Sequence, residues 1–174
     1  GVNIFLGYGD IILVRMNSIT AVAWARSCGS NQDDIGVGLS LDGTTPDHIY
    51  LTGYFERQAG DPQVDFDMVP TPPVADALNY AGGRDIFIAR YRTDATLTEI
   101  DALGSIDMDR PRGLYLYPAN QSLYITGTFR QTADFDPEGT ISNLNAFGSP
   151  WVDNAFVSSY NYSSAPLRIN PFFG

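Results

Sequence analysis

The feature that most constrains the fold is a strand-like segment that occurs twice in the chain. Residues 49–55 have the sequence IYLTGYF, and residues 123–129 have the sequence LYITGTF. Other segments recur at a similar separation of about 70 to 75 residues: 10–15 with 85–90, and 65–67 with 134–136. A nearly constant separation, with one loop that changes length, is typical of a duplicated structural unit.

The repeated segments have the pattern of β-strands. Ile49, Leu51 and Phe55 fall on one face of an extended chain. Tyr50, Thr52 and Tyr54 fall on the other face. This period of two, carried by β-branched and aromatic residues, predicts a strand. Residues 85–91 are apolar on both faces. We therefore expect that strand to lie between two layers.

Two glycines, Gly53 and Gly127, occupy the same position in the two repeated segments. A glycine inside a strand usually marks a bulge or the close approach of another backbone. We expect a close contact at both positions.

The composition also favours strands and turns over helices. All ten basic residues are arginine, and aspartate far outnumbers glutamate among the twenty acidic residues. Aspartate favours turns, whereas glutamate and lysine favour helices. The net charge of −10 would repel a phosphate backbone, so we expect no nucleic-acid partner. No apolar run approaches the length of about 18 residues that a membrane-spanning helix requires.

The order of the motifs resembles the bacterial SBBP-type β-propeller repeat. The resemblance covers roughly residues 7–160 and rests on these segments: Trp24-Ala25, 36–42, 49–55, 64–67 and 82–91. It implies a secreted or surface protein whose repeats each form a four-stranded blade. The family is not defined by catalytic residues, so the resemblance implies no active site. The second copy departs from the pattern, because Glu99 stands in the place of Trp24 and Asn154 in the place of Asp85.

The expected fold is all-β, with two consecutive four-stranded antiparallel blade-like sheets and extra strands at the ends. We divide the chain into an N-terminal strand or arm (1–9), a first repeat unit (10–84), a second repeat unit (85–160) and a C-terminal tail (161–174). Two blades do not close a propeller, which needs about four or more. Some sheet edges are therefore expected to remain open, and open edges tend to pair with other strands.

The open edges lead us to expect a non-enzymatic structural protein, and the resemblance implies that it is extracellular or at the cell surface. Its partners would be other copies of itself, joined through edge strands into a filament or array. The residues expected to mediate assembly are the apolar side chains of the two ends: Val2, Ile4, Leu6, Ile11, Leu13, Phe172 and Phe173. The opposing interpretation is that both ends pack against their own sheets.

Two other functions stay open at this point. The chain could be an adhesion module that binds carbohydrate or another surface protein, within a longer repeat protein. It could also be a hydrolase on a β scaffold, which would need a pair of carboxyl groups clustered in a cleft.

One acidic turn resembles the first half of a calcium-binding loop. Asp134, Asp136 and Glu138 alternate before a glycine, as calcium ligands do, but Asn145 occupies the place of the distal bidentate glutamate. The alternative is a solvated acidic turn. Asp33–Asp34 and Asp107–Asp109 are similar turns. We expect no other cofactor.

The sequence also contains one histidine, one cysteine and two candidate glycosylation sites. His48 is the only histidine, and its position at the start of a strand indicates a structural residue. Cys28 is the only cysteine, so no disulfide can form within the chain, and we expect it to be buried. Asn120 and Asn161 each begin an N-glycosylation triplet.

Overall fold

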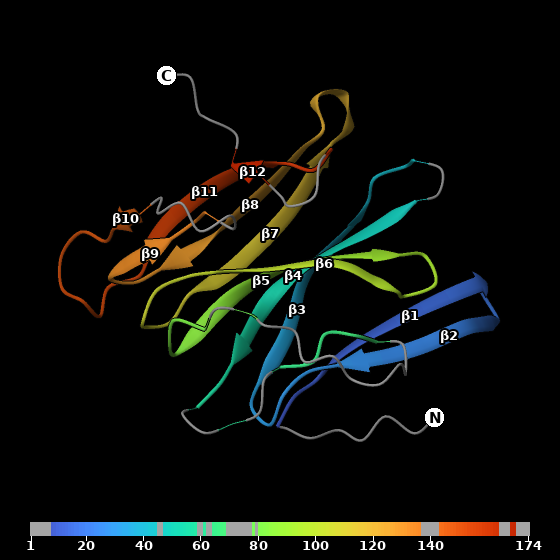
Figure 1. Cartoon of the computed structure of the whole chain (residues 1–174), viewed down its shortest axis with the longest axis horizontal. Coiled ribbons are helices and arrows are strands. Elements are labelled where there is room, and N and C mark those ends of the chain that lie inside the picture. Colours follow the sequence, from blue (N-terminus) through green and yellow to red (C-terminus); the bar gives the residue numbers. More distant parts are fainter. Residues whose placement is uncertain are drawn as a thin grey trace.

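The regular structure is almost entirely β-strand. The computed structural model describes residues 8–44, 47–58, 61, 64–68, 78, 80–136, 143–163 and 168–169. Two of its sheets have four strands and two have two strands (Figure 1). All strand pairs within the sheets are antiparallel. The prediction of two consecutive four-stranded sheets that do not close on each other is confirmed.

The N-terminal hairpin consists of β1 (Ile11–Ser18) and β2 (Ala21–Cys28). The first sheet has the order β3-β4-β5-β6 and contains β3 (Asp34–Leu41), β4 (His48–Glu56), β5 (Arg84–Arg92) and β6 (Leu97–Leu103). The second sheet has the order β12-β11-β8-β7 and contains β7 (Arg110–Tyr117), β8 (Ser122–Phe129), β11 (Asn154–Asn161) and β12 (Arg168–Ile169). The remaining elements are β9 (Thr132–Asp134), β10 (Asn143–Asn145) and the 3-10 turn η1 (Pro118–Asn120).

The boundary expected between the repeat units, at residues 84 and 85, does not separate two sheets. It falls at the start of β5, and β5 pairs along its whole length with β4 of the preceding unit. The first four-stranded sheet therefore combines the end of the first sequence unit with the beginning of the second. A repeat fixes the length of a unit but leaves open which strands of neighbouring units share a sheet. With the sheets divided in this way, the hairpin β1–β2 corresponds to β5–β6 of the first sheet.

The strand β5 of the first sheet is buried on both faces, as the apolar pattern of residues 85–91 predicts. Residues 86 to 89 in β5 are all completely buried. On one face of this sheet, Tyr50, Ile86 and Ile88 belong to a core that also contains Leu123, Ile125 and Phe156 of the second sheet. On the other face, residues of β4 and β5 share a core with Ile11, Leu13 and Cys28 of the hairpin. The three layers therefore enclose two cores. Cys28 is buried, as expected.

The strand glycines lie where another backbone approaches most closely. A Cβ atom on Gly53 would overlap the carbonyl oxygen of Ile35 and lie 2.7 Å from the ring of Phe87. A Cβ atom on Gly127 would overlap the carbonyl oxygen of Arg110. Each glycine faces a register shift in the neighbouring strand, between Gly36 and Gly38 in β3 and between Pro111 and Gly113 in β7. The expectation of close contacts at Gly53 and Gly127 is confirmed.

Candidate functional site

The hairpin exposes a row of apolar side chains on the side opposite its core. Ile12, Val14 and Met16 alternate with the buried Ile11 and Leu13 along β1, and about half of each exposed side chain is accessible. Cross-strand pairing adds Val22 and Ala25 of β2 to the same face. We call Ile12, Val14, Met16, Val22 and Ala25 the hairpin face. Within the described residues, β2 is the only strand that pairs with β1 in a sheet.

An apolar groove separates the hairpin from β3. It has a volume of about 420 Å³, and the side chains that line it are those of Ile11, Ile12, Leu13, Ile35, Val37, Leu39 and Leu51 together with Asp10 and Asp34. A second cavity of about 290 Å³ continues past Trp24 and Leu41. The hairpin is held beside this cavity by two hydrogen bonds to the Thr93 carbonyl oxygen, from Trp24 Nε1 (3.2 Å) and from a guanidinium nitrogen of Arg15 (2.8 Å). The groove therefore lies between two anchored elements.

A second open face lies on the second sheet. Tyr115 pairs with Tyr124 across β7 and β8, and Thr126 pairs with Val157 across β8 and β11. Tyr115 is 62% exposed and Val157 is 59% exposed, whereas their strand neighbours Leu116 and Phe156 point into the core. Together with Ala155, which is also exposed, these residues form the second-sheet face. Neither this face nor the hairpin face contains a charged residue.

Two buried carboxyl pairs occupy equivalent places in the repeats. A Cβ atom on Gly104 would lie 2.5 Å from an Asp85 oxygen and 2.8 Å from an Asp109 oxygen. A Cβ atom on Gly29 would meet Asp10 and Asp34 in the same way. The Ser105 backbone N–H donates to Asp109 at 2.5 Å, and Ser30 does the same to Asp34.

Burial raises the pKa values of Asp34, Asp85 and Asp109. It raises the pKa of Asp85 to about 8, and the charge of Asp109 adds to the effect. It raises the pKa of Asp34 to about 7, and the charge of Asp10 acts in the same direction. Raised pKa values often mark catalytic acids. However, Asp34, Asp85 and Asp109 are at most 1% exposed, and the arrangement is duplicated. We therefore assign both pairs a structural role rather than the acid pair of a hydrolase.

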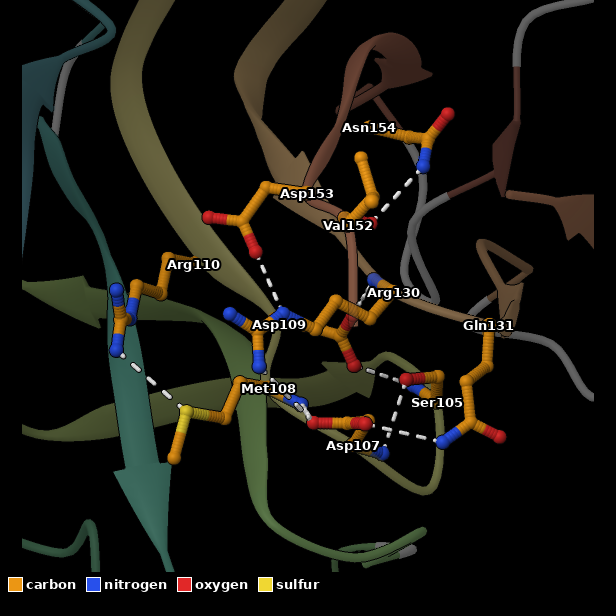
Figure 2. Close-up of polar contacts among 10 residues, drawn as sticks. All are labelled: Ser105, Asp107, Met108, Asp109, Arg110, Arg130, Gln131, Val152, Asp153 and Asn154. Carbon is orange, nitrogen blue, oxygen red and sulfur yellow. Dashed lines mark hydrogen bonds and ion pairs between the residues drawn. The ribbon is translucent and has the colours of Figure 1, made fainter. Parts of the chain in front are cut away.

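Figure 2 shows the polar contacts around Arg130, next to the second carboxyl pair. The guanidinium of Arg130 lies between two carboxylates, 3.6 Å from an oxygen of Asp107 and 2.5 Å from an oxygen of Asp153. In the first repeat, Glu56 and Arg84 form the corresponding ion pair with the charges exchanged. The position of the pair is therefore repeated, although its polarity is not.

This exchange of charge predicts the outcome of a charge swap. Glu56→Arg should lower the free energy of unfolding by about 0.5–1 kcal/mol, because it places two arginines side by side at a partly exposed position. The double variant Glu56→Arg/Arg84→Asp should be more stable than Glu56→Arg, since it reproduces the Arg130–Asp153 arrangement. Urea denaturation of the wild type, both single variants and the double variant measures this coupling. A double variant no more stable than Glu56→Arg would contradict the equivalence.

A loop with two exposed aromatic side chains lies beside this cluster. Phe147 is 86% exposed and Trp151 is 71% exposed. The side chain of Asn154 holds the loop: its oxygen accepts a hydrogen bond from Phe147 N, and its amide nitrogen donates to the carbonyl oxygens of Phe147 and Val152. An aspartate could not make the two donations. Asn154 therefore has a local role that Asp85 could not fill.

The acidic residues considered for calcium form turns. The Asp134 carboxylate accepts a hydrogen bond from the Asp136 backbone N–H at 3.0 Å, and Asp65 caps Asp67 in the same way in the first repeat. Glu138 lies outside the described residues. Among the residues that the structure does describe, no three His, Cys, Asp or Glu side chains are grouped so that they could hold a metal ion. The calcium site therefore stays a prediction from the sequence.

The structure also places the single histidine and the two candidate glycosylation sites. Nδ1 of His48 lies 3.0 Å from Asp42 Oδ2 at the start of β4. Asn120 is exposed at the end of η1, whereas Asn161 is half-buried and its side-chain oxygen accepts hydrogen bonds from Ser163 N and Oγ. The described part of the chain contains no helix that could cross a membrane.

The expected assembly residues require a revision. Val2, Ile4, Leu6, Phe172 and Phe173 lie outside the described residues. Ile11 and Leu13 are 5% and 8% exposed and belong to the core of their own chain, so each offers only the small part of its side chain that lines the groove. The alternation of β1 instead exposes Ile12, Val14 and Met16. The same alternation was visible in the sequence, but it did not show which of the two sets would face the core.

Comparisons with known proteins do not assign the chain to a family. Neither the models of known protein families nor the curated proteins give a match. The similarity to the SBBP-type repeat therefore remains an interpretation of the motifs, and the function has to be argued from the surfaces of the molecule.

Proposed function

We propose that this chain is an extracellular structural protein that associates with copies of itself through its two-stranded N-terminal sheet. The observation that carries the proposal is the apolar groove beside β1, together with the exposed hairpin face. Large exposed apolar surfaces on soluble proteins are typical of interaction sites. A strand that pairs on one side offers backbone groups to an incoming strand on the other.

The electrostatics of the chain support association at this place. The chain carries a net charge of −10, which opposes contact between copies over most of its surface. The hairpin face contains no acidic residue, and the groove beside it is lined mostly by aliphatic side chains. Contact through these surfaces brings fewer like charges together than contact elsewhere.

A concentration series tests the proposal. Sedimentation velocity and negative-stain microscopy of the wild type should show oligomers that grow with protein concentration. Val37→Lys should abolish this growth, because Val37 lines the groove and is 39% exposed. Ile106→Lys is the matched control, since Ile106 is 68% exposed and does not line the groove. A wild type that stays monomeric throughout the series would contradict the proposal.

A second candidate function is supported by the aromatic loop. Phe147 and Trp151 are presented to solvent on a loop held by hydrogen bonds, as the binding site of a carbohydrate- or protein-binding adhesion module would require. Aromatic rings with one apolar face are frequent in such sites. Saccharide titrations followed by tryptophan fluorescence test this candidate. A signal that Trp151→Ala removes would support it, and an unchanged spectrum with every saccharide would count against it for carbohydrate.

A further inference from the structure

We propose that copies of this chain join head to tail, with the second-sheet face of one copy stacked on the hairpin face of the next. The inference rests on the proposed self-association and names the two surfaces that meet. It makes the interface heterologous, so that every copy uses one surface at each end.

The chain buries the same type of contact between layers twice, once on each face of the first sheet. The hairpin packs Ile11 and Leu13 against the first sheet, in the core that contains Phe87. The first sheet packs Ile86 and Ile88 against the second sheet, in the core that contains Phe156. Ile11 and Leu13 are the repeat equivalents of Ile86 and Ile88, and Phe87 is the equivalent of Phe156. Each layer therefore presents one type of face to the layer that follows it.

Among the described residues, one face of each type stays open, on the hairpin and on the second sheet. On the hairpin, Ile12, Val14 and Met16 are the equivalents of Phe87, Ala89 and Tyr91, which are fully buried in the first sheet. On the second sheet, Tyr124, Thr126 and Val157 are the equivalents of Tyr50, Thr52 and Ile88, which are also buried. The two ends thus carry the two halves of an interface that already exists inside the chain.

The side chains of the two open faces determine which kind of partner surface each face can bind. The five residues of the hairpin face are all apolar, and the second-sheet face consists of Tyr115, Tyr124, Thr126, Ala155 and Val157. The five named residues of each face carry no charge, and the nearest charged residue in the strand register is Arg110, which pairs with Thr128 in the row of Ala155. Contact between the two faces therefore brings few charged groups together in a chain of net charge −10. A partner with an acidic or basic surface would lose solvation here without gaining an ion pair. A second copy supplies the uncharged face that fits.

A head-to-tail interface predicts a particular form of assembly. Each added copy exposes a new open face, so association continues until the rotation between copies closes a ring or until a filament forms. An interface between two identical faces would stop at a dimer instead. The two arrangements can therefore be separated by variants that block one end at a time.

The experiment uses Val14→Arg, which blocks the hairpin face, and Val157→Arg, which blocks the second-sheet face. Each variant alone should stay monomeric at concentrations where the wild type forms oligomers. An equimolar mixture should form dimers and nothing larger, because each variant supplies the intact face that the other lacks. Sedimentation velocity distinguishes these species. Both side chains are about half exposed, so the substitutions leave the cores intact.

The outcomes distinguish failure of the head-to-tail arrangement from failure of self-association itself. If the wild type associates but the mixture forms no dimer, or if either variant alone still forms large oligomers, the head-to-tail arrangement is overturned while the proposed self-association stands. If the wild type never associates, both are overturned. Should circular dichroism show that one arginine variant is unfolded, Met16→Lys replaces Val14→Arg and Thr126→Lys replaces Val157→Arg in the same mixing test.

Discussion

Gly53→Ala is expected to lower the free energy of unfolding by more than about 3 kcal/mol. The added Cβ would overlap the carbonyl oxygen of Ile35, which belongs to the backbone of β3 and cannot rotate away. Relief of this overlap requires β3 and β4 to separate in the sheet that lies between the two cores. Because domains are stable by only about 5–15 kcal/mol, such a loss should be clear in a urea denaturation curve.

The matched control is Gly36→Ala, in the strand that pairs with Gly53. The Cβ of an alanine at position 36 would meet Ile11 and Leu51 at 3.5 and 3.6 Å, which is ordinary van der Waals contact. We expect a change within about 1 kcal/mol, since the loss of a flexible glycine offsets any small strain. Equal destabilisation by both substitutions would show that the close approach at Gly53 is not the cause.

The second large effect is a dependence of stability on pH that arises from the buried carboxyl pairs. The folded-state pKa values of Asp34 (about 7) and Asp85 (about 8) lie above the ordinary value of 3.8. The folded state therefore holds protons that the unfolded chain has released. The stability that this provides is fully present below about pH 4 and is lost as the pH rises through 7 to 8.

The free energy of unfolding should fall between pH 5 and pH 8. One unit of pKa shift corresponds to about 1.4 kcal/mol, so Asp85 alone should account for about 2–4 kcal/mol over this range. Asp42 has a lowered pKa, held down by hydrogen bonds from His48 and Thr44 that outweigh its burial. Its contribution is lost only as the pH falls below about 4, so it leaves the range from pH 5 to 8 unaffected.

Asp85→Asn should flatten this dependence and raise stability at pH 8. The second repeat already has an asparagine, Asn154, at this position, and Asp85 Oδ1 has no hydrogen-bond partner. An amide there can donate a hydrogen bond toward Asp109. The control is Asp94→Asn: the pKa of Asp94 is lowered by its hydrogen bonds to Thr96, so this carboxylate is ionised in both states between pH 5 and 8. An unchanged slope in Asp85→Asn would contradict the assignment of this pH dependence to the raised pKa of Asp85.

Local patterns predict the strands of this protein well. The alternation in residues 49–55 and the two-sided apolar run at 85–91 correspond to β4 and β5, and the strand glycines mark close approaches. These features succeed because side-chain direction alternates in any extended chain, whatever its partners are. The carboxyl pairs could also have been found, since Asp10 and Gly29-Ser30 with Asp34 recur 75 residues later at Asp85 and Gly104-Ser105 with Asp109.

Other features could not be predicted, because they depend on pairing between distant segments. The first sheet joins strands from both sides of the expected boundary at residues 84 and 85. The same alternation that defines β1 allowed either Ile11 and Leu13 or Ile12 and Val14 to face the core. Only the packing of the hairpin on the first sheet decided between them.

The sequence by itself determined that this chain is built from duplicated β-strands, and it determined where those strands can tolerate only glycine. The tertiary structure decided which strands share a sheet, which carboxyl groups lose contact with water and which apolar faces remain open at the two ends. The physical reason is that strand formation follows from the period of the side chains along the chain, whereas burial depends on which layer lies against each face.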